Sequence, residues 1–272
     1  ARAVAGDSGE VVLLEVVPVA SAVRSIGGQV IGTAETIQAG YQQMAEEQLA
    51  AAAEKWFAEG DRVDSVVAAG EPGEQILAVA EKTGADLIVM SSHGRGSIGR
   101  FVSGSVADRV VRHAPVPVMV VGPEGDIPAD VKIQRVLAPV DNSELSLAAL
   151  PVAGELAKAT GASVQVLHVV VPATDLAMAY PGAAGAIPPI AVDQTYEELT
   201  TAGKDLVSQA IATLRDQGVD AHGTVYTGSA ASVILDEVKP GDVIVLSSHQ
   251  RQGFARWVLG STSMKLIRNG EA

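Results

Sequence analysis

The sequence contains no cysteine, which excludes disulfide bonds and thiolate chemistry and favours a cytoplasmic protein. Aromatic residues are scarce at 3%, whereas hydrophobic residues as a whole reach 47%, so the core must consist mainly of Val, Ala, Leu and Ile. No apolar run approaches the roughly 20 residues that span a bilayer, and no signal-peptide pattern opens the chain. An aliphatic core of this kind suits buried parallel strands covered by Ala-rich helices.

Positive charge is in deficit. Lys and Arg number 19 against 32 Asp and Glu, which gives a formal net charge of -13. Such a chain is poorly suited to bind the phosphates of nucleic acids or an anionic membrane surface. We therefore expect neither nucleic acid nor a membrane as a partner, and the length of 272 residues suggests about two domains.

An internal repeat is the most informative feature that the sequence does contain. Residues 86–105 begin Asp-Leu-Ile-Val-Met-Ser-Ser-His-Gly and end in Gly-Ser, while residues 242–261 begin Asp-Val-Ile-Val-Leu-Ser-Ser-His-Gln and end in Gly-Ser. The two blocks are offset by 156 residues. A repeat of about 150 residues has the size of a domain, so the pattern predicts a duplicated domain and not a solenoid.

Apolar and amphipathic segments alternate in the same order in both halves. The predicted strands cover 11–17, 63–69, 86–90, 116–121, 136–140, 164–171, 221–227 and 242–246. The predicted helices cover 41–59, 145–160 and 195–217. Alternation of strand and helix predicts parallel sheets with right-handed crossovers.

The predicted domains cover residues 1–123 and 135–272, joined by a linker over 124–134 that is rich in Gly, Pro and acidic residues. The first half has no counterpart of the 136–140 strand, and the second has none of the 116–121 strand. Because unpaired apolar edges are unfavourable, we expect further residues to belong at both ends of this sequence.

Two loops are expected near the carboxyl ends of the strands, where open α/β sheets bind ligands. Residues 178–191 contain three Pro and two Gly, which predicts a long loop without a regular element. Residues 21–40 occupy the same place in the first half. A lid over a ligand and a tolerated insertion both fit this pattern.

Gly94 to Gly99 matches the dinucleotide fingerprint G-x-G-x-x-G, with the acidic Glu124 after the next strand. The second half reads Gln250-Arg251-Gln252-Gly253 at this place and loses the pattern. The strand that precedes it also comes late in the domain, whereas the fingerprint follows a first strand. A dehydrogenase is therefore less favoured than the two functions that are described below.

A different description of the same loop accounts for both halves. The loop reads Ser91-Ser92-His93-Gly94, then nine residues, then Gly104-Ser105. This pattern resembles G-x-x-G-x9-G-[S/T], the ATP-binding signature of the universal stress protein family. The resemblance extends over the Val-Leu-Ala-Pro-Val-Asp-Asn-Ser opening at 136–143, the Gly-x-Pro turn at 70–72, Ala-Asp-Leu-Ile-Val-Met at 85–90 and Pro-Val-Pro-Val-Met-Val-Val at 115–121. The chain is thus similar to a tandem universal stress protein.

The resemblance implies an α/β fold of two tandem Rossmann-like or flavodoxin-like domains. Each would have a mostly parallel five-stranded sheet with helices on both faces, and a pseudo-two-fold would relate them as an intramolecular pseudo-dimer. The family's last strand commonly makes the dimer contact, and the possibility of a homodimer is left open. The implied function is an adenine-nucleotide (ATP) binding sensor or regulator of the stress response, with at most slow ATP hydrolysis.

The chemistry of the loop suits a phosphate independently of the family. Gly94 permits close approach of the backbone, and Gly104-Ser105 lies where a helix begins, with free N–H groups and the helix dipole. The Ser105 hydroxyl either donates to a phosphate or only caps the helix. Ser91 replaces the first Gly of the signature, and in the second half Ser247 and Gln250 replace both. We therefore expect ATP mainly in the first half, with a non-nucleotide interaction module as the alternative.

The resemblance also assigns the nucleoside end of the site. Asp141, after Pro139 and Val140, matches the acidic residue that contacts the nucleoside, and Val170 and Val17 lie near the adenine-facing position or are ordinary core. The complete set of candidate nucleotide-binding residues is Val17, Met90, Ser91, Ser92, His93, Gly94, Arg95, Gly104, Ser105, Val106, Pro139, Asp141, Val170, Gly260, Ser261 and Thr262. The ligand would be ATP, with Mg²⁺ as an optional companion.

Catalysis finds little support in the sequence. None of the five His residues stands at a convincing metal-ligand spacing, and no G-x-S-x-G elbow occurs. His93 and His249 are repeat-equivalent, which favours a role in the turn over a catalytic one. We predict no catalytic residue and no protein-held metal.

Overall fold

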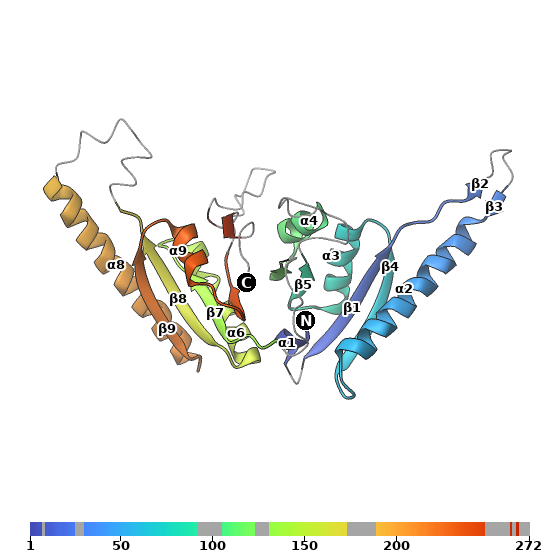
Figure 1. The fold of residues 1–272 in the computed structure, drawn as a ribbon, viewed down its shortest axis with the longest axis horizontal. Helices are drawn as coiled ribbons and strands as arrows, with labels where there is room; N and C mark the ends of the chain where they lie inside the picture. The colour runs from blue at the N-terminus through green and yellow to red at the C-terminus, as the bar shows by residue number, and fades with distance from the viewer. Residues whose placement is uncertain are drawn as a thin grey trace. The chain divides into compact units, whose positions relative to one another are not determined.

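The computed structural model describes residues 1–6, 9–24, 30–91, 105–122, 131–172, 189–247, 262 and 265–266. The chain divides into two compact units, Ala1–Ala129 and Asp130–Ala272 (Figure 1). No helix among the described residues is both long and apolar enough to cross a membrane.

The first unit alternates strands and helices. Its elements are α1 (Arg2–Ala5), β1 (Glu10–Val17), β2 (Val23–Arg24), β3 (Val30–Gly32), α2 (Ala34–Trp56), β4 (Arg62–Ala69), α3 (Pro72–Thr83), β5 (Ile88–Ser91), α4 (Ser105–His113) and β6 (Val118–Val121). β1 pairs with β4 and β5 pairs with β6, both in parallel, while β2 and β3 form an antiparallel hairpin. A core cluster of Ala80, Ile88 and Val110 joins α3, β5 and α4.

The second unit builds a single sheet from its described strands. Its elements are β7 (Arg135–Pro139), α5 (Glu144–Leu147), α6 (Leu150–Thr160), β8 (Ser163–Val170), α8 (Pro189–Asp216), β9 (Ala221–Thr227), α9 (Ala230–Glu237) and β10 (Asp242–Ile244). The strand order is β10-β7-β8-β9, with every pair parallel. This order places the first strand of the unit, β7, inside the sheet.

Helices cover both faces of this sheet. On one face, Gly223 of β9 lies against α8, since a Cβ there would collide with Val207 Cγ1 and lie 2.8 Å from Ile211 Cδ1. On the other face, Tyr226 lies beside Glu237 of α9, and burial together with its interaction with this carboxylate raises the pKa of Tyr226. The two-residue period of a strand thus directs alternate side chains of β9 to α8 and α9.

The largest fully buried side chains include Leu137, Leu167, Leu214 and Ile234.

The structure confirms the α/β class with parallel sheets. The four strands predicted within this sequence for each half are all present among the described residues, as one sheet in the second unit (β10-β7-β8-β9) and as two separate parallel pairs in the first (β1-β4 and β5-β6).

Helix starts were placed wrongly. α2 begins at Ala34 because Thr33 caps it, its side chain accepting from the Thr36 N–H at 3.2 Å. The predicted loop over 178–191 is wrong at its end, since α8 begins at Pro189, a residue that the first turn of a helix accepts. The loop expected over 21–40 contains the β2–β3 hairpin.

The single helix predicted over 145–160 is two helices, α5 and α6, separated at Ala148 and Ala149. Pro151 lies in the first turn of α6, where its missing N–H is harmless. Inside one continuous helix its ring would clash with the preceding turn, which explains the interruption.

One ion pair fastens the start of β7 to the start of β10. Arg135 donates from Nε and Nη2 to the two carboxylate oxygens of Asp242 at 3.1 and 2.6 Å, and from Nη2 to the Glu237 carbonyl at 2.7 Å. The Asp242 side chain is only 4% exposed. The hydrogen bond to Asp242 raises the pKa of Arg135. A buried carboxylate of this kind depends on its partner, because an unpaired buried charge is costly.

We expect Arg135→Met to destabilise the second unit by about 3–5 kcal/mol, since it leaves Asp242 charged and buried. Arg112→Met is the control: it breaks an ion pair with Asp108 whose side chains are 29% and 39% exposed, and should cost about 1 kcal/mol or less. Urea unfolding followed by far-ultraviolet circular dichroism measures both. Equal losses in the two variants would contradict the dependence on burial.

Candidate functional site

Three strand ends meet at one edge of the sheet in the second unit. β7 leads through Val140 into Asp141, β8 ends at Val170, and β9 leads into Gly228. The Val140 N–H donates to the Leu167 carbonyl at 2.7 Å, and the Gly228 N–H donates to the Val170 carbonyl at 3.0 Å. Because the carboxyl ends of parallel strands form the ligand-binding edge of open α/β sheets, this is the candidate site of the second unit.

A network of hydroxyl groups fixes the turn at Asp141. The Ser143 N–H and hydroxyl both donate to Asp141 Oδ1, at 2.9 and 2.5 Å. The Ser146 hydroxyl accepts from the Asp141 N–H at 3.0 Å and donates to the Asp141 carbonyl at 2.8 Å. Ser143 also caps α5, accepting from the Ser146 N–H at 3.1 Å. The carboxylate of Asp141 is exposed yet oriented by its own turn.

Val170 and its repeat mate Val17 occupy the same place in the two units. They are 4% and 6% exposed, so both are core residues. The carbonyl of Val17 accepts from the Gly70 N–H at 3.0 Å, as that of Val170 does from Gly228. Gly70 and Gly228 have φ of +148° and +139°, which side chains rarely adopt. The duplicated sequence therefore reproduces one strand-to-turn geometry twice.

The candidate phosphate site of the first unit begins where β5 ends. Met90 lies in β5 and packs on the core cluster, while Ser91 is the exposed last residue of the strand. α4 begins at Ser105 itself, which is exposed, and Val106 packs inward. Ser92, His93, Gly94, Arg95 and Gly104 lie outside the described residues, so the loop between strand and helix stays a prediction.

The start of α4 offers backbone donors. The first four N–H groups of a helix have no acceptor within it, and the helix dipole adds positive potential there. Asp108 brings a negative charge into this first turn, but Arg112 Nε pairs with its carboxylate at 2.7 Å. That hydrogen bond raises the pKa of Arg112. The ion pair with Arg112 thus offsets the negative charge of Asp108 near the N-terminal end of α4, the end that would face an anion.

Arg109, in the middle of α4, connects this helix to the start of α3. Its guanidinium lies 2.5 Å from Glu74 Oε1 and 3.4 Å from Glu71 Oε2. Its side chain also covers Gly73, where an added Cβ would lie 2.7 Å from Arg109 Cδ. Sequence reasoning missed this contact, since no motif marks an arginine that joins two helices.

In the second unit, the described residues at the matching positions, Thr262, Lys265 and Leu266, are helical. Thr262 is helical and half-buried, and Leu266 is buried at 3% exposure, like its repeat mate Val110 at 0%. Lys265 stands at the place of Arg109 and is exposed. Gly260 and Ser261 lie outside the described residues. Pro139 is the last residue of β7 and is half-buried. It belongs to the second unit, where the residues predicted to contact the nucleoside lie.

Among the described residues no group of three or more His, Asp or Glu is placed to hold a metal ion. The three His in this part of the chain have ordinary partners. His113 Nδ1 bonds the Arg109 carbonyl at 2.8 Å, His168 Nδ1 bonds the Val140 carbonyl at 2.9 Å, and His222 Nε2 lies 3.1 Å from Asp220 Oδ1. His93 and His249 lie outside the described residues.

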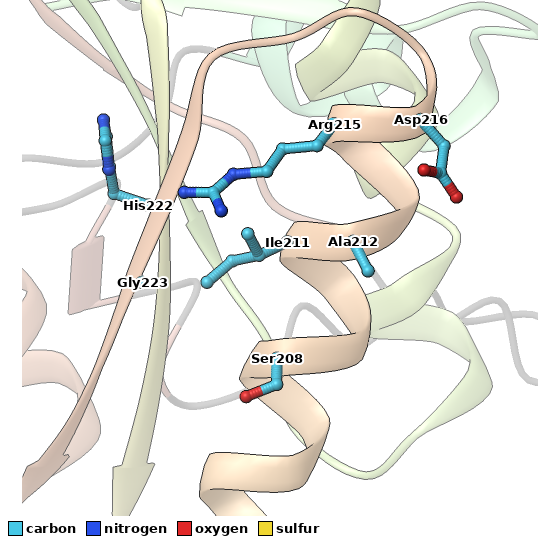
Figure 2. A pocket seen from close by; sticks show the side chains of 7 residues that line it. All are labelled: Ser208, Ile211, Ala212, Arg215, Asp216, His222 and Gly223. Carbon is cyan, nitrogen blue, oxygen red and sulfur yellow. The ribbon is translucent and has the colours of Figure 1, made fainter.

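A hollow of about 580 Å³ lies between α8 and β9, but at the opposite end of the sheet (Figure 2). It is lined by Ser208, Ile211, Ala212, Arg215, Asp216, His222 and Gly223. Figure 2 shows Arg215 reaching toward β9 while Asp216 points away from it. Arg215 donates from Nε and Nη2 to the Ala221 carbonyl at 3.0 and 2.7 Å. This guanidinium is used to satisfy the first carbonyl of an edge strand, so the hollow is no candidate site.

One protein family matches both halves of the chain. The universal stress protein family model covers residues 1–122 and 132–272. A universal stress protein of Mycolicibacterium smegmatis is 29% identical over 187 residues, which make up 68% of this chain and 59% of that relative. One of Mycobacterium tuberculosis is 27% identical over 189 residues, 68% of this chain and 56% of the relative. The match thus spans less than two thirds of the length of these relatives.

Solved structures show the same fold over nearly the whole chain. A universal stress protein from Archaeoglobus fulgidus covers 98% of this chain and 86% of its own, with a TM-score of 0.63 at 20% identity. A protein of unknown function from Pseudomonas aeruginosa covers 96% and 90%, with a TM-score of 0.53 at 15% identity. At such identities these structures support the fold and carry nothing about ligands.

We expect Ser146→Ala to destabilise the second unit by about 1–2 kcal/mol, because it removes the acceptor of the Asp141 N–H and the donor to the Asp141 carbonyl. Ser208→Ala is the matched control. That hydroxyl is exposed and bonds only within α8, to the Lys204 carbonyl at 2.7 Å; its loss should change stability by less than about 0.5 kcal/mol. Guanidinium unfolding compares the two, and a loss in Ser146→Ala no larger than in the control would contradict the network.

Proposed function

Since the chain belongs to the universal stress protein family, with the family's domain in each half, we propose that it binds ATP and acts as a sensor or regulator in the stress response. Binding would take place mainly in the first half, through the loop that joins β5 to α4. Hydrolysis would be slow or absent. The match of the family model to both halves establishes the family, and the ligand is our inference from the residues.

One observation carries this proposal: the signature loop connects a strand end to the free start of a helix. Ser91 ends β5 and Ser105 begins α4, with Gly94 and Gly104 at the spacing of the signature. Glycines allow the backbone to approach a phosphate, and the first N–H groups of α4 donate to it. Ser105 stands at the first helical position, where its hydroxyl and its N–H would both reach an anion.

Mg²⁺ would bind through the nucleotide. The described residues supply no cluster of carboxylates for the ion. Mg²⁺ commonly keeps several waters and takes phosphate oxygens as ligands, so this fits a metal that arrives with ATP. Its chemistry there would be neutralisation of phosphate charge.

Asp141 and Val170 supply the corresponding nucleoside end in the second unit. In this proposal the Asp141 carboxylate accepts hydrogen bonds from hydroxyl groups of the ligand. Val170 forms the apolar floor of the site in the second unit, and Val17 does so in the first. The turn around Asp141 is already ordered by Ser143 and Ser146, which lowers the entropy lost on binding.

The second candidate is an interaction module that binds no nucleotide. It is favoured by Ser91, Ser247 and Gln250, which add side chains where the signature has glycine. Gln250 in particular would fill the volume of a phosphate. The two candidates differ in whether ATP binds at all, which a direct titration measures.

We expect calorimetric titration of ATP with Mg²⁺ into the full-length protein to give one site per chain. Gly104→Asp should weaken binding at least about tenfold, because a carboxylate would repel the phosphates at the start of α4. Gly260→Asp, its repeat equivalent, is the control and should leave the affinity within about twofold. Loss of heat in both variants, or in neither, would contradict a site in the first half. Absence of heat in the unaltered protein would favour the interaction module.

The role of Ser105 is separable from helix stability. An acidic residue in the first turn of a helix is favourable with the helix dipole, so Ser105→Asp should preserve the thermal unfolding midpoint while it weakens ATP binding at least about fivefold through charge repulsion. Ser105→Ala should lower affinity less, because the backbone N–H groups remain. If Ser105→Asp binds ATP like the unaltered protein, the phosphate does not lie at the start of α4.

A further inference from the structure

His168 lies near the carboxyl end of β8, between the apolar residues Leu167 and Val169. Its Nδ1 is 2.9 Å from the Val140 carbonyl oxygen, and the ring is half-buried. A carbonyl oxygen only accepts, so Nδ1 must carry the hydrogen and donate. This bond forms with either the neutral or the charged imidazole, since Nδ1–H is present in both.

Consecutive residues of β8 therefore hold both ends of Val140. The Leu167 carbonyl accepts the Val140 N–H at 2.7 Å, and the His168 ring donates to the Val140 carbonyl. β7 itself ends one residue earlier, at Pro139. The His168 side chain thus fixes the peptide group that leads directly into Asp141.

The helix that covers His168 has a gap shaped for it. Gly203 lies inside α8, and a Cβ added there would be 2.5 Å from His168 Cδ2 and 3.1 Å from His168 Nε2. Glycine in a helix interior lowers stability relative to alanine, so its presence needs a packing reason. Here the absent side chain leaves space for the ring, which is held between the helix and the sheet.

The first unit lacks this arrangement at the matching positions. Aligning Val17 with Val170 places Glu15 opposite His168, and aligning Gly70 with Gly228 places Ala45 opposite Gly203. Ala45 is 1% exposed, so α2 buries a methyl group where α8 has none. An ionised Glu side chain has no hydrogen to donate to a carbonyl. The histidine and the glycine thus occur together in the unit that contains Asp141.

We propose that His168 is a positioning residue for the nucleoside end of the second unit, holding the Val140 carbonyl so that Asp141 is presented to a ligand. Gly203 serves this role by admitting the ring. The proposal rests on the proposed function for its ligand, but its structural part concerns only the turn from Val140 to Ser146. The two parts are measured separately.

Hydrogen exchange of the free protein, followed by nuclear magnetic resonance at single amides, measures the turn. His168→Leu, which keeps bulk but removes the donor, should speed exchange at the Asp141 and Ser143 amides by about tenfold. His168→Asn places an amide N–H near the position of Nδ1–H and should restore slow exchange. The Val245 amide, which donates to the Leu137 carbonyl at 2.9 Å, should be unchanged and controls for loosening of the whole sheet.

Gly203→Ala perturbs the same contact from the helix. It should speed exchange at Asp141 when His168 is present and have no such effect in the His168→Ala background, where the added methyl group has room. This pair of backgrounds keeps the test valid if His168→Leu alone fails to fold. The positioning role would be overturned if a folded His168→Leu variant exchanged the Asp141 amide at the unaltered rate. It would also be overturned if His168→Asn failed to restore slow exchange there.

Titration with adenosine measures the ligand part, because a nucleoside can bind at Asp141 without the phosphate loop that Ser247 and Gln250 alter in this half. We expect Asp141→Ala to abolish adenosine binding, His168→Leu to weaken it at least about fivefold and His168→Asn to recover it. An Asp141-dependent event that His168→Leu leaves intact would overturn the proposal. If the unaltered protein binds no adenosine, or if Asp141→Ala leaves the binding intact, the proposed function fails for this half, and the exchange rates still decide whether His168 orders the turn.

Discussion

The parallel pairing of β7 with β8 is the constraint on which the candidate site of the second unit depends. In this register the Val140 N–H meets the Leu167 carbonyl, and His168 comes next to the Val140 carbonyl. A slip by one residue would turn every side chain of β8 to the opposite face. His168 would then leave the gap at Gly203, and the peptide before Asp141 would lose its donor. The buried pair of Arg135 with Asp242 fixes the same strand, β7, from its other neighbour.

Duplication has kept the backbone of the site and changed the side chains around it. Val17 with Gly70 and Val170 with Gly228 repeat one hydrogen bond at 3.0 Å, and both glycines have positive φ. The surroundings differ, because Arg109 joins two helices in the first unit, whereas the second has the exposed Lys265 at the matching position. Backbone geometry is shared because the strand ends demand it, whereas the side chains are free to specialise each half.

Sequence patterns sufficed for the order of the parallel strands, because such buried strands are clear runs of Val, Leu and Ile. They failed at helix starts, where a single capping residue such as Thr33 outweighs composition, and at Pro151, which divides a continuous helical pattern. Asp141 was predicted as a candidate site residue through a resemblance to a known family. The contact between His168 and Gly203 was not predicted, because the two residues are 35 positions apart in the chain and meet only through the packing of α8 on β8. Its only trace in the sequence was a glycine within a helical segment.

The net charge of -13 restricts how an anion such as ATP could be bound. Its field opposes the approach of a nucleotide, although at physiological salt this repulsion is screened beyond about 8 Å. Affinity must therefore come from groups in direct contact. In the described part of the first unit the cations near α4 are already committed, Arg109 to two glutamates and Arg112 to Asp108. Backbone N–H groups and the Ser105 hydroxyl then remain as the donors at α4, supported by the helix dipole. A divalent cation carried by the nucleotide would reduce the charge that they must neutralise.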